Sequence, residues 1–244
     1  MKKNFVLAAI IPAAFLMTGC DTTGLSVREQ HNSYAAMING VYREAPAAAT
    51  NKPLVRPMRL AVAQIGEVAP DAALVAALSR DTSLVREVIP VPMPGDTVGN
   101  YGNNYSDAKS NTPENLAAQV QSARNLARDS GADYLLLVGG SIDSFDTKNV
   151  LAVFDLTIVG GYLVPGSKIH MDGKAAGALV DVESGRVVFM VNSQVHQAES
   201  TPDFFCTQKR NEMGADMREQ ILKVLAGDVL ERAGRQPSEH AVTR

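Results

Sequence analysis

A cysteine near the amino terminus lies where a lipid-attachment reaction needs one. Two lysines precede an apolar run that ends at Met17, and Cys20 closes the sequence Leu-Met-Thr-Gly-Cys. A charged segment, an apolar segment of this length and a closing cysteine form the pattern of a bacterial lipoprotein signal. In that pattern the cysteine thiolate takes a diacylglycerol, and the freed amine takes a further acyl chain. Two or three acyl chains hold a protein firmly to a membrane, so we predict covalent lipid on Cys20 and removal of residues 1–19.

Two other interpretations of this segment stay open. It could be an ordinary secretory signal, or an uncleaved apolar terminus with an incidental cysteine. Under the lipoprotein interpretation, the mature chain is anchored in a bacterial cell envelope and faces the periplasm. Asp21 resembles the signal that retains lipoproteins of enteric bacteria in the inner membrane. Because that rule does not extend to all bacteria, the choice between inner and outer membrane stays undecided.

Two histidines are the candidates for metal chemistry. His170 and His196 fall in two strand patterns around a turn at Gly185, roughly opposite each other, with Asp172 and Glu199 nearby in sequence. Histidine and carboxylate are common zinc ligands, so a metal-dependent envelope enzyme is one hypothesis. No further ligand has a matching spacing, and alternating polar positions are typical of a solvent-facing strand. We therefore expect no metal and no cofactor besides the lipid, and keep these two histidines as the metal candidates.

The other polar residues form no recognised catalytic pattern. The sequence has no G-x-S-x-G, H-E-x-x-H, Walker or C-x-x-C motif. Asp143 and Asp146 are expected at the end of a strand, where aspartate commonly bonds backbone groups, whereas Asp155 interrupts an apolar run. Cys206, the second cysteine, is expected to be a buried thiol. We predict that the chain is not an enzyme.

Composition excludes several classes of partner. The formal net charge of −3 gives no nucleic-acid footprint, and the lack of tryptophan with 5% aromatic residues argues against a stacking site for sugars or bases. No later run is long and apolar enough to predict an internal transmembrane helix. Residues 93–112 are rich in asparagine and glycine and predict a loop. Its Tyr101 and Tyr105 are candidate partner contacts, because tyrosine is common in polar binding loops.

The strand and helix patterns predict a mixed α/β (α+β) domain. Thr112 is a good N-cap, Pro113 suits the first helical turn, and Gly131 suits the position after the last. Glu183-Ser184-Gly185 predicts a tight turn within a hairpin over 174–195. A βα start followed by antiparallel strands gives a largely antiparallel sheet with helices packed on it. The expected strands are 58–65, 83–91, 132–145, 149–164, 168–182 and 186–200, and the expected helices follow Pro70, span 112–131 and span 207–233.

Four segments follow from these patterns. Residues 1–19 form the signal peptide, and 20–55 form a lipidated tether and linker. Residues 56–233 form the α/β domain, which is long enough to bury a core of its own. Residues 234–244 form a flexible tail.

The apolar pattern over 149–164 also allows a membrane hairpin over 149–174. About ten residues of a tilted strand suffice to cross a bilayer. Lys168, His170 and Asp172 alternate there with Ile169 and Met171, as in a strand with one polar and one apolar face. The alternative is an interior sheet strand that helices cover.

Two short motifs resemble those of a group of envelope lipoproteins. Gly131-Ala132-Asp133 precedes an apolar strand, and Asp181-Val182-Glu183-Ser184-Gly185-Arg186 lies between two apolar strands. Over about 55–230, this pattern is similar to the fold shared by the curli-secretion lipoprotein CsgG, the amino-terminal domain of TolB and the penicillin-binding-protein activator LpoB. Tyr162-Leu163-Val164-Pro165-Gly166 also resembles the rhombotarget lipoproteins, although the Gly-rich carboxy-terminal signal of that branch is absent.

The resemblance implies a fold, and this fold serves channels, activators and scaffolds alike. It also implies other envelope proteins as partners and a homo-oligomer such as a ring. The leading hypothesis is a membrane-anchored, non-enzymatic binding, assembly or scaffolding factor of the cell envelope. The alternatives are an oligomeric secretion-pore subunit of the curli type and a metal-dependent envelope enzyme.

Overall fold

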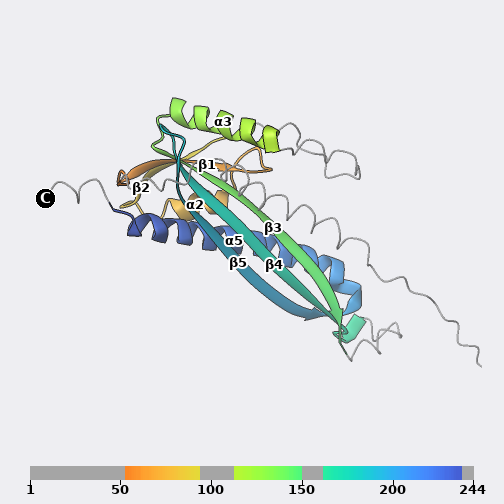
Figure 1. Cartoon of the computed structure of the whole chain (residues 1–244). Coiled ribbons are helices and arrows are strands. Elements are labelled where there is room, and N and C mark those ends of the chain that lie inside the picture. The colour runs from red at the N-terminus through yellow and green to blue at the C-terminus, as the bar shows by residue number, and fades with distance from the viewer. Residues whose placement is uncertain (1–52, 94–112, 150–161, 238–244) are drawn as a thin grey trace, which may run out of the picture.

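The computed structural model describes residues 53–93, 113–149 and 162–237. They form a five-stranded sheet in the order β2-β1-β3-β4-β5 with helices on both faces (Figure 1). β1 runs parallel to β2 and β3, whereas β3, β4 and β5 are antiparallel neighbours. The predicted α+β class with a mixed, largely antiparallel sheet is therefore confirmed. The strands are β1 (Met58–Gln64), β2 (Val85–Pro90), β3 (Tyr134–Lys148), β4 (Ser167–Asp181) and β5 (Val187–Thr201).

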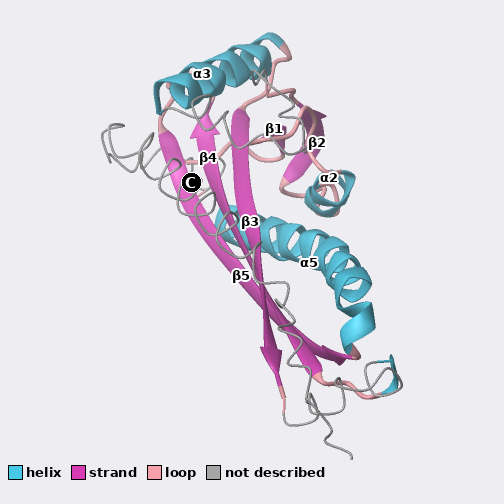
Figure 2. Cartoon of the chain, turned by 90° about the vertical axis from the view of Figure 1, so that its right-hand side faces the viewer, coloured by secondary structure: helices cyan, strands magenta, loops and turns pink. Residues whose placement is uncertain are grey.

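Three of these strands are much longer than the other two. β3, β4 and β5 have 15 residues each, whereas β1 has 7 and reaches only the first part of β3, from Tyr134 to Val138. At about 3.3 Å per residue, the long strands span roughly 50 Å. They project as a three-stranded arm from the end of the sheet where all five strands lie side by side, which we call the wide end (Figure 2). The arm comprises 139–148 of β3, 167–176 of β4 and 192–201 of β5, and its tip is the row Lys148, Ser167 and Thr201.

Helices cover the two faces of the sheet unequally. α2 (Ala72–Leu78) and α5 (Cys206–Arg235) pack on one face, where Leu74 and Leu225 join Leu136 of β3 in the main core. α3 (Pro113–Asp129) packs on the other face at the wide end, where Ala123 and Leu137 belong to a second core. α5 also continues along the arm. There its Met213 and Met217 bury Ile169 and Met171 of β4, so the arm has one face covered by α5.

Most predicted elements are confirmed within a few residues, and two expectations are wrong. The strand expected over 149–164 fails at Tyr162 and Leu163, which are helical, and residues 150–161 lie outside the described residues. β3 pairs directly with β4, so no further strand lies between them. Asp143 and Asp146 lie within β3 and not at its end, because pairing with β4 continues as far as Lys148.

Both ends of the described chain lie at the wide end. The amide of Leu54 donates a hydrogen bond to the carbonyl of Pro237 at 2.9 Å. Among the described residues, no helix is both long and apolar enough to span a membrane.

Candidate functional site

The predicted site residues fall in different parts of the chain. Cys20, Tyr101, Tyr105 and Asp155 lie outside the described residues, so the predictions for them stay predictions. His170 and His196 lie on the arm. The side chains of β4 alternate there, with Ile169 and Met171 buried under α5 and Lys168 exposed on the opposite face. The described part of the hairpin considered for membrane crossing therefore has its apolar side covered by a helix.

The two histidines are neighbours across the hairpin, but they are not directly opposite. His170 pairs with Ala198, and His196 pairs with Asp172. Their ring centroids are 5.8 Å apart. The offset of two residues arises from the turn over 182–186 and from a register irregularity between Leu179 and Val180.

Each histidine already has partners. His196 Nδ1 lies 2.7 Å from Asp172 Oδ1. The ring of His170 stacks on Phe145 with centroids 4.8 Å apart, and its Nε2 lies 3.2 Å from the Thr147 hydroxyl. Within the described ranges, no three His, Cys, Asp or Glu side chains are placed to hold a metal ion. The structure thus pairs the two predicted histidines without adding the third ligand that zinc needs.

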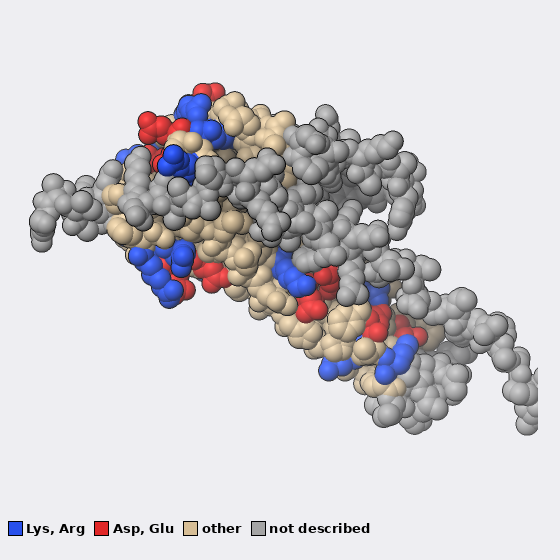
Figure 3. Space-filling view, viewed as in Figure 1, with Lys and Arg blue, Asp and Glu red and all other residues tan. Residues whose placement is uncertain are grey.

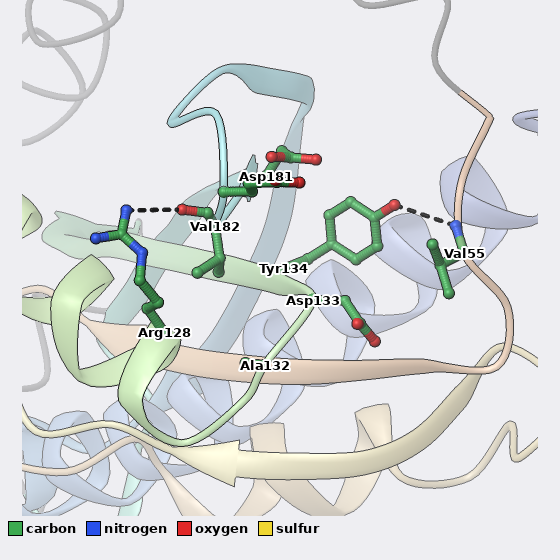
Figure 4. A pocket seen from close by; sticks show the side chains of 8 residues that line it. Val55, Arg128, Ala132, Asp133, Tyr134, Asp181 and Val182 are labelled. Atoms are coloured by element: carbon green, nitrogen blue, oxygen red, sulfur yellow. Dashed lines mark hydrogen bonds between the residues drawn. The ribbon is translucent and has the colours of Figure 1, made fainter.

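A cavity of about 270 Å³ lies at the wide end, near the start of β3 (Figure 4). The Tyr134 hydroxyl accepts a hydrogen bond from the Val55 amide there, and Arg128 Nη2 donates to the Val182 carbonyl at 3.3 Å. Both aspartates of the lining hold backbone. Asp133 Oδ2 accepts from the Arg59 amide, and Asp181 Oδ1 accepts from the amide and hydroxyl of Ser184. The two carboxylates therefore fix a strand end and a turn, so their role in the cavity wall is structural.

The two sequence motifs meet at this cavity. The Val182 amide donates to the Asp133 carbonyl at 3.2 Å, which joins the two segments. Gly131 and Gly185 have φ of 70° and 72°, a region that favours glycine. A Cβ on Gly185 would also lie 2.5 Å from Nη1 of Arg124, whose Nη2 donates to the Glu183 carbonyl of this turn. The motif residues are therefore explained by folding.

The sequence interpretation missed an exposed aromatic group at the tip. We call Tyr162, Leu163, Phe204 and Phe205 the tip cluster. Tyr162 stacks on Phe204 with ring centroids 4.0 Å apart and meets Phe205 edge-on at 6.0 Å. The four side chains are 46%, 73%, 57% and 43% exposed, in sequence order. The available signal was the adjacent phenylalanine pair just before the expected helix, because two neighbouring side chains cannot both face one core.

Ion pairs surround the tip cluster. Lys148 pairs with Asp203, Arg210 pairs with Asp146, and Lys209 Nζ lies 2.7 Å from Glu199 Oε1. Figure 3 shows oppositely charged side chains beside one another along the described part of the arm. The charges around the cluster are therefore largely balanced.

Asp203 and Cys206 lie together behind the cluster. A hydrogen bond from Lys148 lowers the pKa of Asp203, and a second from the Ser167 hydroxyl at 2.9 Å acts in the same direction. Burial raises the pKa of the Cys206 thiol, and the Asp203 carboxylate adds to that shift. The thiol is half-buried, so it is less enclosed than its position after two phenylalanines predicted.

Comparisons with known proteins give similarity to solved structures alone. No family model matches the chain, and no curated protein matches it. A minor lipoprotein from Acinetobacter baumannii is 12% identical with a TM-score of 0.37, over 75% of this chain and 97% of that one. A PelC dodecamer from Paraburkholderia phytofirmans is 15% identical with a TM-score of 0.31, over 71% and 88%. The LpoB C-terminal domain from Salmonella enterica is 15% identical with a TM-score of 0.29, over 69% and 98%. At these TM-scores the similarities carry no argument about function.

Proposed function

We propose that this chain is a lipoprotein of the bacterial cell envelope that acts by binding other envelope proteins and not by catalysis. Its anchor is lipid on Cys20, and its domain faces the periplasm. The observation that carries the proposal is the tip cluster. It exposes aromatic side chains at the end of the arm farthest from both ends of the described chain.

The tip cluster has the composition of a binding surface. Contiguous apolar patches are uncommon on soluble proteins, and those with a polar rim usually mark contact sites. Aromatic residues are enriched at such sites, and a few buried anchors supply most of the binding energy. Stacking of Tyr162 on Phe204 holds both rings before a partner arrives, which lowers the entropy cost of ordering them.

The charges around the cluster favour a protein over an anionic lipid surface as the partner. An anionic leaflet attracts an excess of lysine and arginine. Here Lys148, Arg210 and Lys209 each face a carboxylate, so exposed Lys168 adds only one further positive charge among the described residues next to the tip. The surface fits an apolar groove on another protein, with polar groups at its rim.

The position of the anchor agrees with this arrangement. The described chain begins at residue 53 at the wide end, beside Pro237. A tether over 20–55 could reach roughly 100 Å when extended. It would let the arm point away from its membrane toward a partner. Tyr101 and Tyr105 are proposed as further contacts.

Site-specific photo-crosslinking in membranes tests this function. A photoreactive residue replaces Phe204 in the full chain, and the same residue at Val68, which is 61% exposed near the start of α2, serves as the matched control. We expect the Phe204 probe to capture an envelope protein and the Val68 probe to capture none. Capture of lipid alone, or equal capture from both positions, would contradict the proposal.

The anchor has its own test. Cys20→Ala should abolish labelling by a palmitate analogue and move the chain from the membrane fraction to the soluble fraction. A Cys20→Ala chain that remains in the membrane fraction would show that another segment holds it there.

A further inference from the structure

The outer edge of β5 offers a strand-pairing surface. β5 ends the sheet order and pairs only with β4 among the described strands. Its side chains are correspondingly more exposed. Val191 and Val195 are half-buried although they lie on the face that α5 covers, whereas Ala175 of β4 on that face is buried. An edge of 15 residues presents a long row of backbone donors and acceptors to another strand.

The two edges of this sheet are built differently. β2 is 6 residues long, carries Arg86 and Glu87, and ends in Pro90, which has no amide to donate. Such short, charged and proline-containing edges prevent pairing with other chains. β5 has no proline and no glycine, and Glu199 is its one charged residue. β5 therefore lacks the protection that the opposite edge has.

Three partly exposed valines lie along this edge on the α5 side, and we call Val191, Val195 and Val224 the apolar strip. Ser193 is hydrogen-bonded to Asp228, and Gln197 is hydrogen-bonded to Gln220. On α5, Val224 lies one turn from Asp228 and one turn from Gln220. It is therefore level with Val195, which lies midway between the two bonded residues of β5. Val224 is 37% exposed. A strand added to β5 would cover this strip, which α5 alone leaves partly open.

We propose that β5 pairs antiparallel with β5 of a second copy of this chain, about a two-fold axis near Gln194. This arrangement makes the strip of each copy meet its own equivalent, as an isologous contact requires. The exposed-face residues Asn192, Gln194 and His196 would then face one another as hydrogen-bonding side chains. Glu199 would lie opposite Phe189 of the other copy, so the two glutamates stay well apart.

The strand's chemistry favours a second copy over a foreign strand. Charge complementarity is one source of specificity for a different partner, and a strand with few charges offers such a partner little to match. β5 offers one carboxylate, and Lys209 already pairs with it at 2.7 Å. A nearly uncharged strand is compatible with itself, since like charges directly opposite each other would be destabilising. This contact is made by β5 and uses none of the residues of the tip cluster.

Thiol crosslinking tests the proposed pairing directly. In a full-length Cys206→Ser background, Gln194→Cys places a thiol at the edge, and Lys174→Cys places one in the same row of β4. Across the axis, directly opposed Cβ atoms on β5 lie about 5 Å apart. The corresponding residues of β4 lie three strand spacings apart, roughly 14 Å. A short bismaleimide should therefore double the mass of the Gln194→Cys chain and leave Lys174→Cys and the background unchanged.

Charge substitution provides a second measurement. Gln194→Lys and Gln194→Glu should each be monomeric by light scattering, because like charges meet at the axis, and a mixture of the two should restore the doubled mass. A monomeric parent chain would overturn the proposal. Equal crosslinking at Lys174, or crosslinks from Gln194 only to other proteins, would overturn it as well.

Discussion

Two hydrogen bonds join Asp133 to Arg59, one between main-chain atoms and one from the Arg59 amide to the Asp133 carboxylate. The Asp133 amide donates to the Arg59 carbonyl at 2.9 Å, and Asp133 Oδ2 accepts from the Arg59 amide at 2.7 Å. The Arg59 guanidinium also donates to the Gly131 carbonyl. This exchange fixes the start of β3 against β1, beside the place where Val182 joins Asp133. The pair therefore sets the register of the sheet at the wide end.

Removal of the Asp133 carboxylate should destabilise the fold. Asp133→Ala leaves the partly buried Arg59 amide without its acceptor, which costs about 1–3 kcal/mol of unfolding free energy. Asp133→Asn keeps an acceptor oxygen and should lose clearly less. Urea unfolding of the two variants measures the difference. Asp129→Ala, on the exposed end of α3, is the control and should change little. Equal losses in Asp133→Ala and Asp133→Asn would show that charge and not the acceptor matters.

Local signals predicted the elements whose ends are set locally. α3 ends at Asp129 and is followed by Gly131 at positive φ, and the turn at Gly185 closes the predicted hairpin. Each of these depends on a few consecutive residues. Long-range pairing decided the rest. The length of β3, and with it the position of Asp143 inside the strand, depends on β4. The offset of His170 from His196 depends in part on a bulge that the local pattern does not reveal.

The tip cluster was not predictable for a related reason. An apolar residue such as Phe204 is expected in a core unless the fold places it where no core remains. That happens here because the three long strands extend beyond α3 and beyond the two short strands. The exposure of a residue then depends on the relative lengths of elements distant in sequence.

Two glycines should respond oppositely to alanine. A Cβ on Gly173 of β4 would lie 2.7 Å from Met217 Sδ, whereas a Cβ on Gly227 of α5 meets nothing within 4 Å. Gly173→Ala should therefore lower the unfolding free energy by about 1–3 kcal/mol through overpacking. Gly227→Ala should raise it by about 0.5–1 kcal/mol, because alanine is the better helix former. Thermal unfolding compares the two. Destabilisation by Gly227→Ala would mean that this helix face is covered in solution.

Asp203 should give the tip an acid-sensitive contribution to stability. Lys148 lowers the pKa of Asp203 below its usual 3.8, so the folded state favours the carboxylate. The contribution is then complete above the unfolded pKa and is lost as pH falls through the lower folded value. Asp203→Asn should be less stable than the parent at pH 6, and the difference should shrink below about pH 4. Unfolding curves of both chains over this range measure it, and a constant difference would contradict the assignment.

Cys206 should react slowly with alkylating agents for a thiol that is not fully buried. Burial raises its pKa, and only the thiolate reacts, so the native chain holds less reactive species at pH 8 than an unfolded chain does. Iodoacetamide should therefore label the folded protein more slowly than the protein in urea. Asp203→Asn should speed labelling, because the Asp203 charge also raises the thiol pKa and its removal leaves Lys148 nearby. Cys206→Ser provides the background rate. If Asp203→Asn left the rate at pH 8 unchanged but moved the unfolding midpoint, the aspartate would hold the tip together without tuning the thiol.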